Sequence, residues 1–346
     1  MIIRRAAELR NVLLRGGVDG MLISGHKNVG YLTGTLGIEG LALITRSGSF
    51  LITDPRFSQE AQSAAGFIPE ITKSPLATMR KITRSLKIRR LGFEPNNISY
   101  AGFNKLKKGL KGITLIPVSG RVEKLRAVKT DKEIACIKRA AKITLKSLTQ
   151  VKRFIRPGIS EKDLAARLDM ALRHNGAEGN AFPTIVASGP NTAKPHARPT
   201  ARKFRLNDII MIDIGANYMG YSSDLTRVFF LGRISANLKR AYKIVKEAQE
   251  KAIRAIRPGV RASKIDGLTR NYIESKGFGK YFTHSLGHGV GLDVHESPRF
   301  SGKDKTPLLK GMVLTVEPGI YLPGEGGVRV EDMVLVTKRG CVVLTR

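Results

Sequence analysis

Cysteine, acidic side chains and long apolar runs are all scarce in this chain of 346 residues. The two cysteines, Cys136 and Cys341, are too few for a disulfide framework, and each lies in an apolar context that suits a buried thiol. No apolar run approaches the roughly 20 residues that a membrane-spanning helix needs. The first ten residues, MIIRRAAELR, are typical of an amphipathic helix and not of a signal peptide. We therefore expect a cytoplasmic protein with no membrane partner.

The shortage of acidic residues, 28 against 60 lysines and arginines, leaves a formal net charge of +32. A charge of this size can indicate nucleic-acid binding, but a binding surface should concentrate it. Here the excess is spread over both halves of the chain, and the densest runs, 87–90 and 105–111, fall on helices expected to face solvent. We interpret the charge as a generally basic surface and expect no nucleic-acid partner.

The length allows two domains, each with a sizeable core. We predict an α/β domain over residues 1–122, with a first helix that ends at Gly16-Gly17, and a second domain over residues 123–346. No strand of the first domain is followed by a G-x-G-x-x-G or P-loop motif, so no nucleotide site is expected there. Its elements alternate as in a doubly wound sheet, with strands expected at 20–24, 41–48, 49–57, 90–93 and 113–117 and helices at 76–86 and 100–108.

The second domain contains an internal repeat. Thr130 and Glu133 have capping-box spacing, which starts a helix that runs to IRPG at 155–158, and another helix begins at Ser160. A helix ending in IRPG and followed by a further helix recurs at 238–259. Each half then returns to strands, FPTIVASG in the first and GVGLDVHE in the second. Two similar halves packed about a pseudo-twofold axis would leave a cleft where polar groups converge.

Two aspartates stand out in the segment 207–230. The run 209–214 is apolar and β-branched around Asp213, and 221–230 alternates after a glycine turn, so we predict two antiparallel strands that bring Asp224 beside Asp213. Burying such a pair is unfavourable unless a cation neutralises it, which favours a shared metal site. The alternative is that Asp213 caps a turn and Asp224 pairs with Arg227.

Histidines and glutamates supply further candidate ligands. Three of the six histidines, His284, His288 and His295, fall within HSLGHGVGLDVHE, and neutral imidazole is a common metal ligand and proton carrier. Glu317 follows an apolar strand, and Glu331 follows the β-rich run GVRV. The alternatives are packed core histidines and a solvated ion pair between Glu331 and Arg329.

Taken together, these positions supply one imidazole and four carboxylates, in the order Asp213, Asp224, His288, Glu317 and Glu331. Ligation rich in carboxylates suits two hard or borderline divalent ions, Mn²⁺ or Co²⁺, better than a metal that prefers thiolates. Two such ions can share a bridging water, lower its pKa and hold a substrate oxygen while hydroxide attacks.

The motifs MIDIG, SSDLTR, GHGVGLDVHE, TVEPGIY and GVRVED, in this order, resemble the pita-bread metallopeptidases. The resemblance is closest to the Xaa-Pro group, which comprises prolidase (Xaa-Pro dipeptidase) and aminopeptidase P. It covers the whole chain, because NVGYLTG, LITDPRF, EKLRAVKTDKEI and FPTIVASGPNTAKPH also match. It implies a two-domain α/β protein, with a creatinase/prolidase-type N-terminal domain and a pseudo-twofold α+β catalytic domain.

The resemblance also implies roles for individual residues. Asp213 would bind one metal, Asp224 and Glu331 would bridge two, and His288 and Glu317 would bind the other. The ions would be Mn²⁺ or Co²⁺, with Zn²⁺ as a further option, and Glu317 would also shuttle the proton. The remaining assignments are His196 and His295 at the scissile carbonyl and its oxyanion, His284 and Phe182 in the pocket wall, Arg299 on the free carboxylate of a dipeptide, and Arg329 behind the bridging carboxylate.

The expected activity is metal-dependent hydrolysis of the Xaa-Pro bond by a homodimeric enzyme, with small peptides that carry proline at the second position as substrates. Arg299 favours a dipeptidase, while aminopeptidase P, acting on longer peptides, is the alternative. The complete ligand set argues against creatinase, the metal-free relative. An alternative of another class is a catalytically silent member of the fold that binds nucleic acid or protein.

Overall fold

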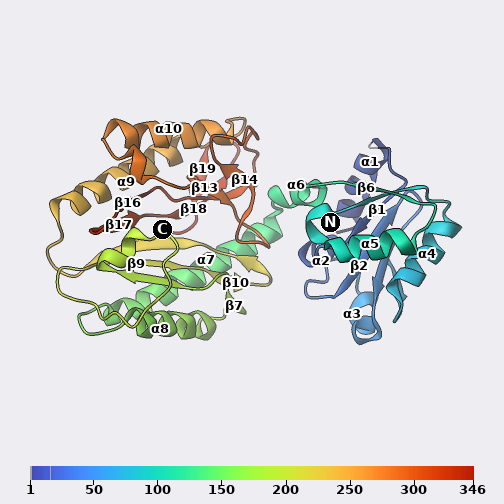
Figure 1. The fold of residues 1–346 in the computed structure, drawn as a ribbon, viewed down its shortest axis with the longest axis horizontal. Coiled ribbons are helices and arrows are strands. Elements are labelled where there is room, and N and C mark those ends of the chain that lie inside the picture. The colour runs from blue at the N-terminus through green and yellow to red at the C-terminus, as the bar shows by residue number, and fades with distance from the viewer. Residues whose placement is uncertain (1, 16) are drawn as a thin grey trace. The chain divides into compact units, whose positions relative to one another are not determined.

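The computed structural model describes residues 2–15 and 17–346, and among the first sixteen residues it describes the side chains of 5–11 only. Contacts between Cα atoms divide the chain into two compact units, Met1–Arg126 and Ala127–Arg346. Figure 1 shows the elements of each. Among the described residues, no helix combines the length and the apolar character needed to cross a membrane.

Unit 1 is built on a six-stranded mixed sheet with the order β4-β3-β2-β1-β5-β6. The central strand β1 (Gly20–Ile23) pairs antiparallel with β2 and parallel with β5, so a hairpin is joined to a doubly wound half. The other strands are β2 (Gly40–Thr45), β3 (Ser49–Thr53), β4 (Ile68–Ile71), β5 (Arg90–Phe93) and β6 (Thr114–Pro117). The helices are α1 (Ile2–Arg15), α2 (His26–Thr33), α3 (Ser58–Gln62), α4 (Pro75–Ser85), α5 (Tyr100–Gly109) and α6 (Arg121–Ala127), whose last residue lies in unit 2.

The predicted alternation of strands and helices in unit 1 is confirmed, and four elements are additional. Helix α2 begins at His26 after the N-cap residue Gly25, which offers no side-chain cap, and the helix includes Gly30, so its sequence carries no helix signal. The short helix α3, the short edge strand β4 and the helix α6 also lie outside the predicted elements. The expected stop of the first helix falls partly on Gly16, which lies outside the described residues; Gly17 follows in a left-handed conformation.

The first half of unit 2 packs two helices against two small sheets. The capping box at Thr130 and Glu133 is confirmed and starts α7 (Asp131–Val151), and a second box at Ser160 starts α8 (Glu161–His174). The sheets have the orders β12-β9-β8 and β11-β10-β7. Their strands are β7 (Gly179–Asn180), β8 (Ile185–Ser188), β9 (Ile209–Ile214), β10 (Ala216–Tyr218), β11 (Tyr221–Ser222) and β12 (Leu225–Phe230).

The second half repeats the helix pair with α9 (Ala236–Ala255) and α10 (Ala262–Ser275). Figure 1 shows the strands of unit 2 between α9 and α10 on one side and α7 and α8 on the other. Its sheets have the orders β14-β13-β15-β18-β19 and β16-β17. The strands are β13 (Gly287–Gly289), β14 (Glu296–Phe300), β15 (Val313–Val316), β16 (Gly319–Leu322), β17 (Gly326–Arg329), β18 (Asp332–Val336) and β19 (Cys341–Val343). Short 3₁₀ helices occupy Pro55–Phe57, Pro95–Asn97, Lys152–Phe154, Gly189–Ala193 and Gly279–Tyr281.

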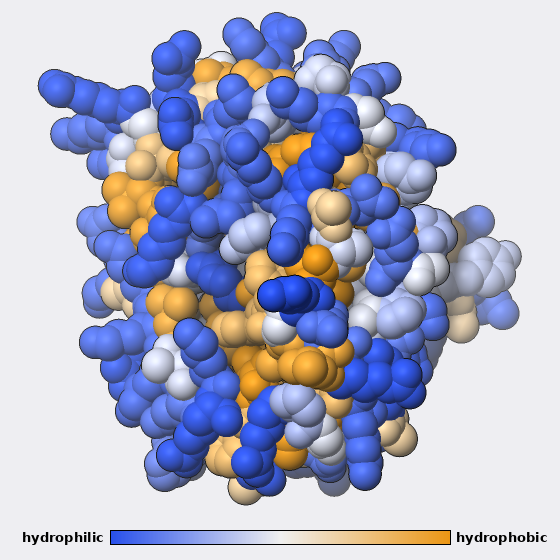
Figure 2. All heavy atoms as spheres, turned by 90° about the vertical axis from the view of Figure 1, so that its left-hand side faces the viewer, coloured by the Kyte–Doolittle hydropathy of each residue, from blue (hydrophilic) through white to orange (hydrophobic). Residues whose placement is uncertain are grey.

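The repeat in the sequence is confirmed by the two helix pairs, but GVGLDVHE is not one strand. Only its first and last residues, Gly289 and Glu296, lie on strands, and the residues between form a loop. The register between β13 and β14 shifts after His288, which opens the ladder. Each half has its own apolar core, with Leu168 and Ile212 in the first and Val245 and Leu314 in the second. On the face drawn in Figure 2, hydrophilic residues surround apolar residues that gather toward the middle.

Candidate active site

The two predicted aspartates meet at the paired strands β9 and β12. Asp213 lies on β9 and is buried, and its register partner on β12 is Thr226. Asp224 lies just before β12, in a break between β11 and β12, and not on a continuous returning strand as the alternation predicted. It is 5% exposed, so both carboxylates are buried beside each other at this end of the strand pair.

His288 and Glu317 come from neighbouring strands of the second half. His288 is the middle residue of β13, and Glu317 directly follows β15. The Nε2 atom of His288 lies 3.1 Å from Oε1 of Glu317, while its Nδ1 atom lies 3.1 Å from the carbonyl of Gly289. A side chain at Gly287 would collide with the backbone of Thr315, so glycine allows β13 to approach β15 closely.

Glu331 lies between β17 and β18 and is 1% exposed. Its Oε2 atom accepts a hydrogen bond of 2.7 Å from the hydroxyl of Thr226. The same hydroxyl accepts a 3.0 Å hydrogen bond from Nε of Arg329. Thr226 therefore fixes the carboxylate of Glu331 from the β12 side.

Arg329 is a buried cation behind the acidic cluster. Its Nη2 atom donates to Oδ2 of Asp213 over 2.7 Å, and Nη1 donates to the carbonyl of Pro195 and the hydroxyl of Tyr321. The solvated ion pair between Arg329 and Glu331, considered as an alternative, is thus absent from the described contacts. Arg227 pairs with Asp332 and not with Asp224, so that alternative is wrong as well.

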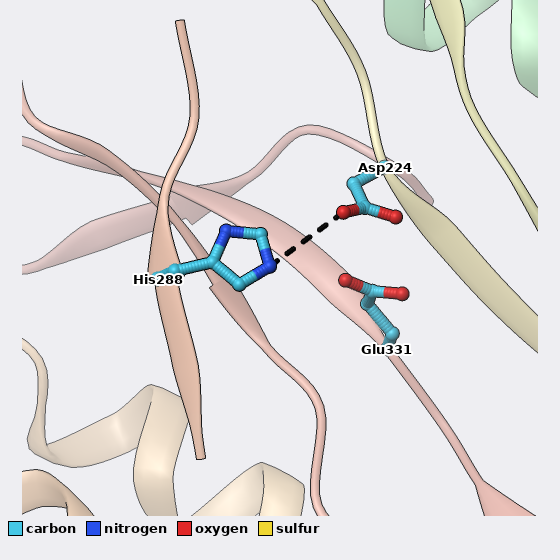
Figure 3. Close-up of side chains that lie close together, drawn as sticks. All are labelled: Asp224, His288 and Glu331. Carbon is cyan, nitrogen blue, oxygen red and sulfur yellow. Dashed lines mark ion pairs between the residues drawn. The ribbon is translucent and has the colours of Figure 1, made fainter. Parts of the chain in front are cut away.

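Asp224 of the first half of unit 2 and His288 and Glu331 of the second half point toward one another (Figure 3). One ligand atom from each lies within 4.8 Å of the others, a spacing that a single metal ion can bridge. Nε2 of His288 is 3.7 Å from Oδ2 of Asp224. These three residues are among the five candidate ligands that the sequence indicated.

The cluster forms the floor of a pocket of about 480 Å³ in unit 2. Every candidate site residue named from the sequence lines this pocket: Phe182, His196, Asp213, Asp224, His284, His288, His295, Arg299, Glu317, Arg329 and Glu331. The rings of His288 and His295 meet edge to face, with centroids 4.3 Å apart. Pro183, Ile185, Pro195 and Pro199 add apolar surface. The pocket therefore combines an acidic floor, imidazole donors and an apolar wall.

Sequence reasoning missed the hydroxyl groups that orient these side chains. The Tyr321 hydroxyl lies 2.9 Å from Nε2 of His284 and accepts from Arg329. The Thr315 hydroxyl donates to Glu317 over 3.0 Å and accepts from the backbone N–H of His288. Thr226 and Thr315 each lie two residues from a ligand, on the strand-like spacing that places side chains on one face, which is the signal that could have found them.

Comparison with known proteins gives the family. Residues 135–338 match metallopeptidase family M24, and residues 5–128 match the creatinase/prolidase N-terminal domain. The chain belongs to metallopeptidase family M24. The solved Xaa-Pro dipeptidase of Bacillus anthracis is similar over 100% of this chain and 98% of its own, with 38% identity and a TM-score of 0.97.

Two further M24 relatives extend the comparison. The Xaa-Pro dipeptidase of Pyrococcus horikoshii is 37% identical over 96% of this chain and 94% of its own. The solved X-Pro aminopeptidase of Thermotoga maritima is 36% identical over 99% of this chain and 97% of its own, with a TM-score of 0.90. The fold is thus a creatinase-type N-terminal domain followed by the pita-bread catalytic domain of the M24 hydrolases.

The buried carboxylates of this M24 site fit the divalent metal ions that the family implies. Burial raises the pKa of Asp224 well above its usual range, and the charges of Glu331 and Asp213 raise it further. Burial and the charge of Glu317 likewise raise the pKa of Glu331. Asp213 Oδ1 and Glu331 Oε1 are buried without a hydrogen-bond partner among the described residues. Carboxylate oxygens in such positions are the ligand atoms that hard divalent ions take.

Two histidines that line the M24 pocket have lowered pKa values. Burial lowers the pKa of His284, and burial together with the charge of His288 lowers the pKa of His295. Burial opposes the charge on Glu317, yet the hydrogen bond and the charge of His288 lower the pKa of Glu317 to about 2. His284 and His295 are therefore neutral near pH 7, each with one N–H to donate.

Proposed function

We propose that this M24 enzyme is an Xaa-Pro dipeptidase. The observation that carries the proposal is the lining of one pocket by four carboxylates, four imidazoles and Arg299. A dipeptide with proline second has a scissile carbonyl, an apolar ring and a free carboxylate close together. The pocket offers a complementary group for each of the three.

The metal-binding residues of this proposal are Asp213, Asp224, His288, Glu317 and Glu331, with two Mn²⁺ or Co²⁺ ions per subunit. When bound, the ions supply Lewis acidity that activates water and polarises the scissile carbonyl. Arg329 donates a hydrogen bond to Asp213, and Thr226 donates one to Glu331. These two hydrogen bonds orient the carboxylates of Asp213 and Glu331.

The other residues bind substrate and move protons. Glu317 takes the proton of the attacking water and delivers it to the proline nitrogen. His196 and His295 donate to the carbonyl oxygen as negative charge develops on it. Phe182 and His284 form the wall beside the proline ring, and the Arg299 guanidinium binds the free carboxylate.

The substrates of a dipeptidase and of an aminopeptidase P differ after the proline. A dipeptide ends there with a free carboxylate, whereas a longer peptide continues with a further amide bond. The Thermotoga maritima relative carries the name X-Pro aminopeptidase, so this alternative has a specific observation in its favour. Arg299 favours the dipeptidase, because a guanidinium in the pocket lining can bind the free carboxylate of a substrate that ends at proline.

The deciding experiment is hydrolysis of Met-Pro beside a longer Met-Pro-Yaa peptide, with Mn²⁺ or Co²⁺ and again after chelation. Metal-dependent cleavage of the dipeptide supports the proposal. A preference for the longer peptide would make the enzyme an aminopeptidase P. Cleavage of neither peptide by metal-loaded protein would overturn both assignments and favour a binding protein of this fold.

The resemblance to the Xaa-Pro group also leads us to propose a homodimer in the cytoplasm. Light scattering on the purified chain measures the oligomeric state, and a mass near twice 37.9 kDa is expected. Fractionation of cells that express the chain measures its cellular location.

A further inference from the structure

Glu161 is a fully buried carboxylate outside the candidate active site. It is the first residue of α8, has 0% exposure, and forms part of no metal cluster among the described residues. Its two oxygens accept hydrogen bonds from five donor groups on three residues: Ser188 N and Oγ, Asn191 Nδ2, and Thr200 N and Oγ1. An anion with so many donors is held rigidly, because each donor would otherwise be left unsatisfied.

All of these donors belong to the connection that carries His196. Ser188 ends β8, Asn191 lies in the 3₁₀ helix that follows, and Thr200 lies four residues beyond His196. Glu161 Oε1 holds the first end of the connection over 2.7 to 2.8 Å, and Oε2 holds the second end over 2.6 to 2.9 Å. One carboxylate thus closes the segment 188–200 into a loop.

Two other contacts attach the middle of this loop to the second half of unit 2. The hydroxyl of Thr192 accepts from the backbone N–H of Gly327 over 2.7 Å. The carbonyl of Pro195 accepts from Arg329 over 3.0 Å. His196 itself is exposed at the pocket wall. Its direction is therefore set by the ends of the loop and by its neighbour Pro195.

We propose that Glu161 is a positioning residue that fixes His196 for the reaction by holding both ends of the 188–200 loop. The inference rests on the proposed function for the role of His196. Glutamine has nearly the same shape, but its NH₂ group would face N–H and O–H donors. Asn191 and Thr200 would then lose an acceptor, and one end of the loop would be released.

The test is Glu161→Gln, measured as kcat and KM for Met-Pro with metal at saturation. A misplacement of about 1 Å can lower a rate on the order of 100-fold, so we expect kcat to fall on the order of 10- to 100-fold with little change in KM. The matched control is Asp163→Asn, which removes another carboxylate from the first turn of α8 without touching the loop. It should change kcat less than about twofold.

A double-mutant cycle distinguishes positioning of His196 from a general structural effect. If Glu161 acts through His196, Glu161→Gln should cost little in the His196→Ala background and its full factor in the Arg299→Ala background. An equal loss in both backgrounds would overturn the proposal. Unchanged kcat in the single variant would overturn it as well.

Amide hydrogen exchange gives a readout independent of activity. Glu161→Gln should speed exchange at the amide of Thr200, whose acceptor is Oε2, and Asp163→Asn should not. Thr200→Val, which removes one donor to Glu161, provides a milder variant should Glu161→Gln fail to fold, with the same direction of effect expected. Failure of the wild type to cleave Xaa-Pro would count against the proposed function, whereas unchanged exchange would count against the role of Glu161.

Discussion

At the scale of single residues, buried hydroxyl groups decide where the ligand carboxylates point. Thr226 and Thr315 are both fully buried, and each donates to a glutamate of the acidic cluster. Tyr321 links His284 to Arg329. A carboxylate with one oxygen held in this way presents its other oxygen in a fixed direction, which lowers the entropy lost when an ion binds.

Replacing Thr226 by valine keeps its shape and removes its hydroxyl. Oε2 of Glu331 then loses its donor and Nε of Arg329 loses an acceptor. We expect metal affinity to fall about 10- to 100-fold, the usual effect of removing such a supporting contact. Calorimetric titration with Mn²⁺ measures it. Thr269→Val, at a buried threonine whose hydroxyl donates to the carbonyl of Ile265 within α10, is the control and should leave affinity unchanged.

Replacing Arg299 by alanine should reduce hydrolysis of Xaa-Pro far more than hydrolysis of Xaa-Pro-Yaa. Only the dipeptide places a free carboxylate beside the proline ring, where a guanidinium can bind it through two hydrogen bonds. The ratio of the two kcat/KM values measures the effect, and the exposed Lys303→Ala serves as the control. An equal loss on both peptides would remove the proposed role of Arg299.

At the scale of elements, helix starts and strand ends carry the strongest local signals. The side chain of Thr130 caps α7 and that of Ser160 caps α8, each with a reciprocal acidic partner. In unit 1, the carboxylate of Asp19 just before β1 accepts from the backbone N–H groups of Arg89 and Arg90, which ties β1 to the start of β5. These contacts are local in space, so their loss is expected to act on stability before activity.

Removing the cap of α8 should lower the free energy of unfolding. Ser160→Ala deletes the hydroxyl that accepts from the Asp163 N–H at 3.1 Å, and such a loss costs typically about 1 kcal/mol. Urea denaturation measures the change. Ser275→Ala, at an exposed position near the end of α10, should stay within about 0.5 kcal/mol of the wild type. Equal effects of the two substitutions would show that the cap adds nothing specific.

The stabilising contribution of Asp19 to unit 1 should be lost in acid. Hydrogen bonds from the backbone of Arg89 and Arg90 lower the pKa of Asp19, because they favour its charged form. Since the folded pKa lies below the unfolded value of about 3.9, the stabilisation is fully present above that value and is lost as the pH falls through the folded pKa.

The measurement is the free energy of unfolding of the wild type and of Asp19→Asn between pH 6 and pH 2.5. The difference between them should be largest near pH 6 and shrink as the pH falls below about 4. Glu60→Gln, on the exposed face of α3, is the control. A difference that does not vary with pH would contradict the assignment.

At the scale of the whole molecule, the dominant features are the two-fold arrangement of unit 2 and the charge. Each half of unit 2 contributes ligands from strands that face the other half, so the site exists only when both halves are folded. The net charge of +32 accompanies hydrophilic residues that cover most of the face in Figure 2. Like charges at this density repel one another and destabilise the compact state.

Salt should therefore stabilise the protein. The Debye length falls from about 30 Å at 0.01 M to about 8 Å at 0.15 M ionic strength, which screens repulsion between distant surface cations. We expect the melting temperature at pH 7, with chelator present, to rise over this range of KCl. The same series near pH 10, close to the sequence pI of about 10.5, is the control and should show a smaller rise. A falling melting temperature at pH 7 would contradict this view of the charge.

Local sequence signals predicted most elements, and their failures have physical causes. Apolar runs and capping boxes gave α7, α8, α9 and β9 because these elements satisfy their own backbone and bury one face. The prediction of a strand at GVGLDVHE was wrong, because the glycines and the register shift after His288 interrupt the ladder there. The residues after Gly289 form a loop instead. Asp224 was placed on a strand because alternation does not reveal the break that turns its carboxylate toward Glu331.

The sequence by itself determined the family, the two-domain order and the identity of the candidate ligands, because ordered motifs of unusual residue types survive without any knowledge of contacts. The tertiary structure decided which groups hold those ligands. Arg329 reaches Asp213 across 116 positions, Thr226 reaches Glu331 across 105, and Glu161 reaches Thr200 from a different element. Such pairs leave no periodic trace in the chain, since only the tertiary packing of unit 2 brings their atoms within hydrogen-bonding distance.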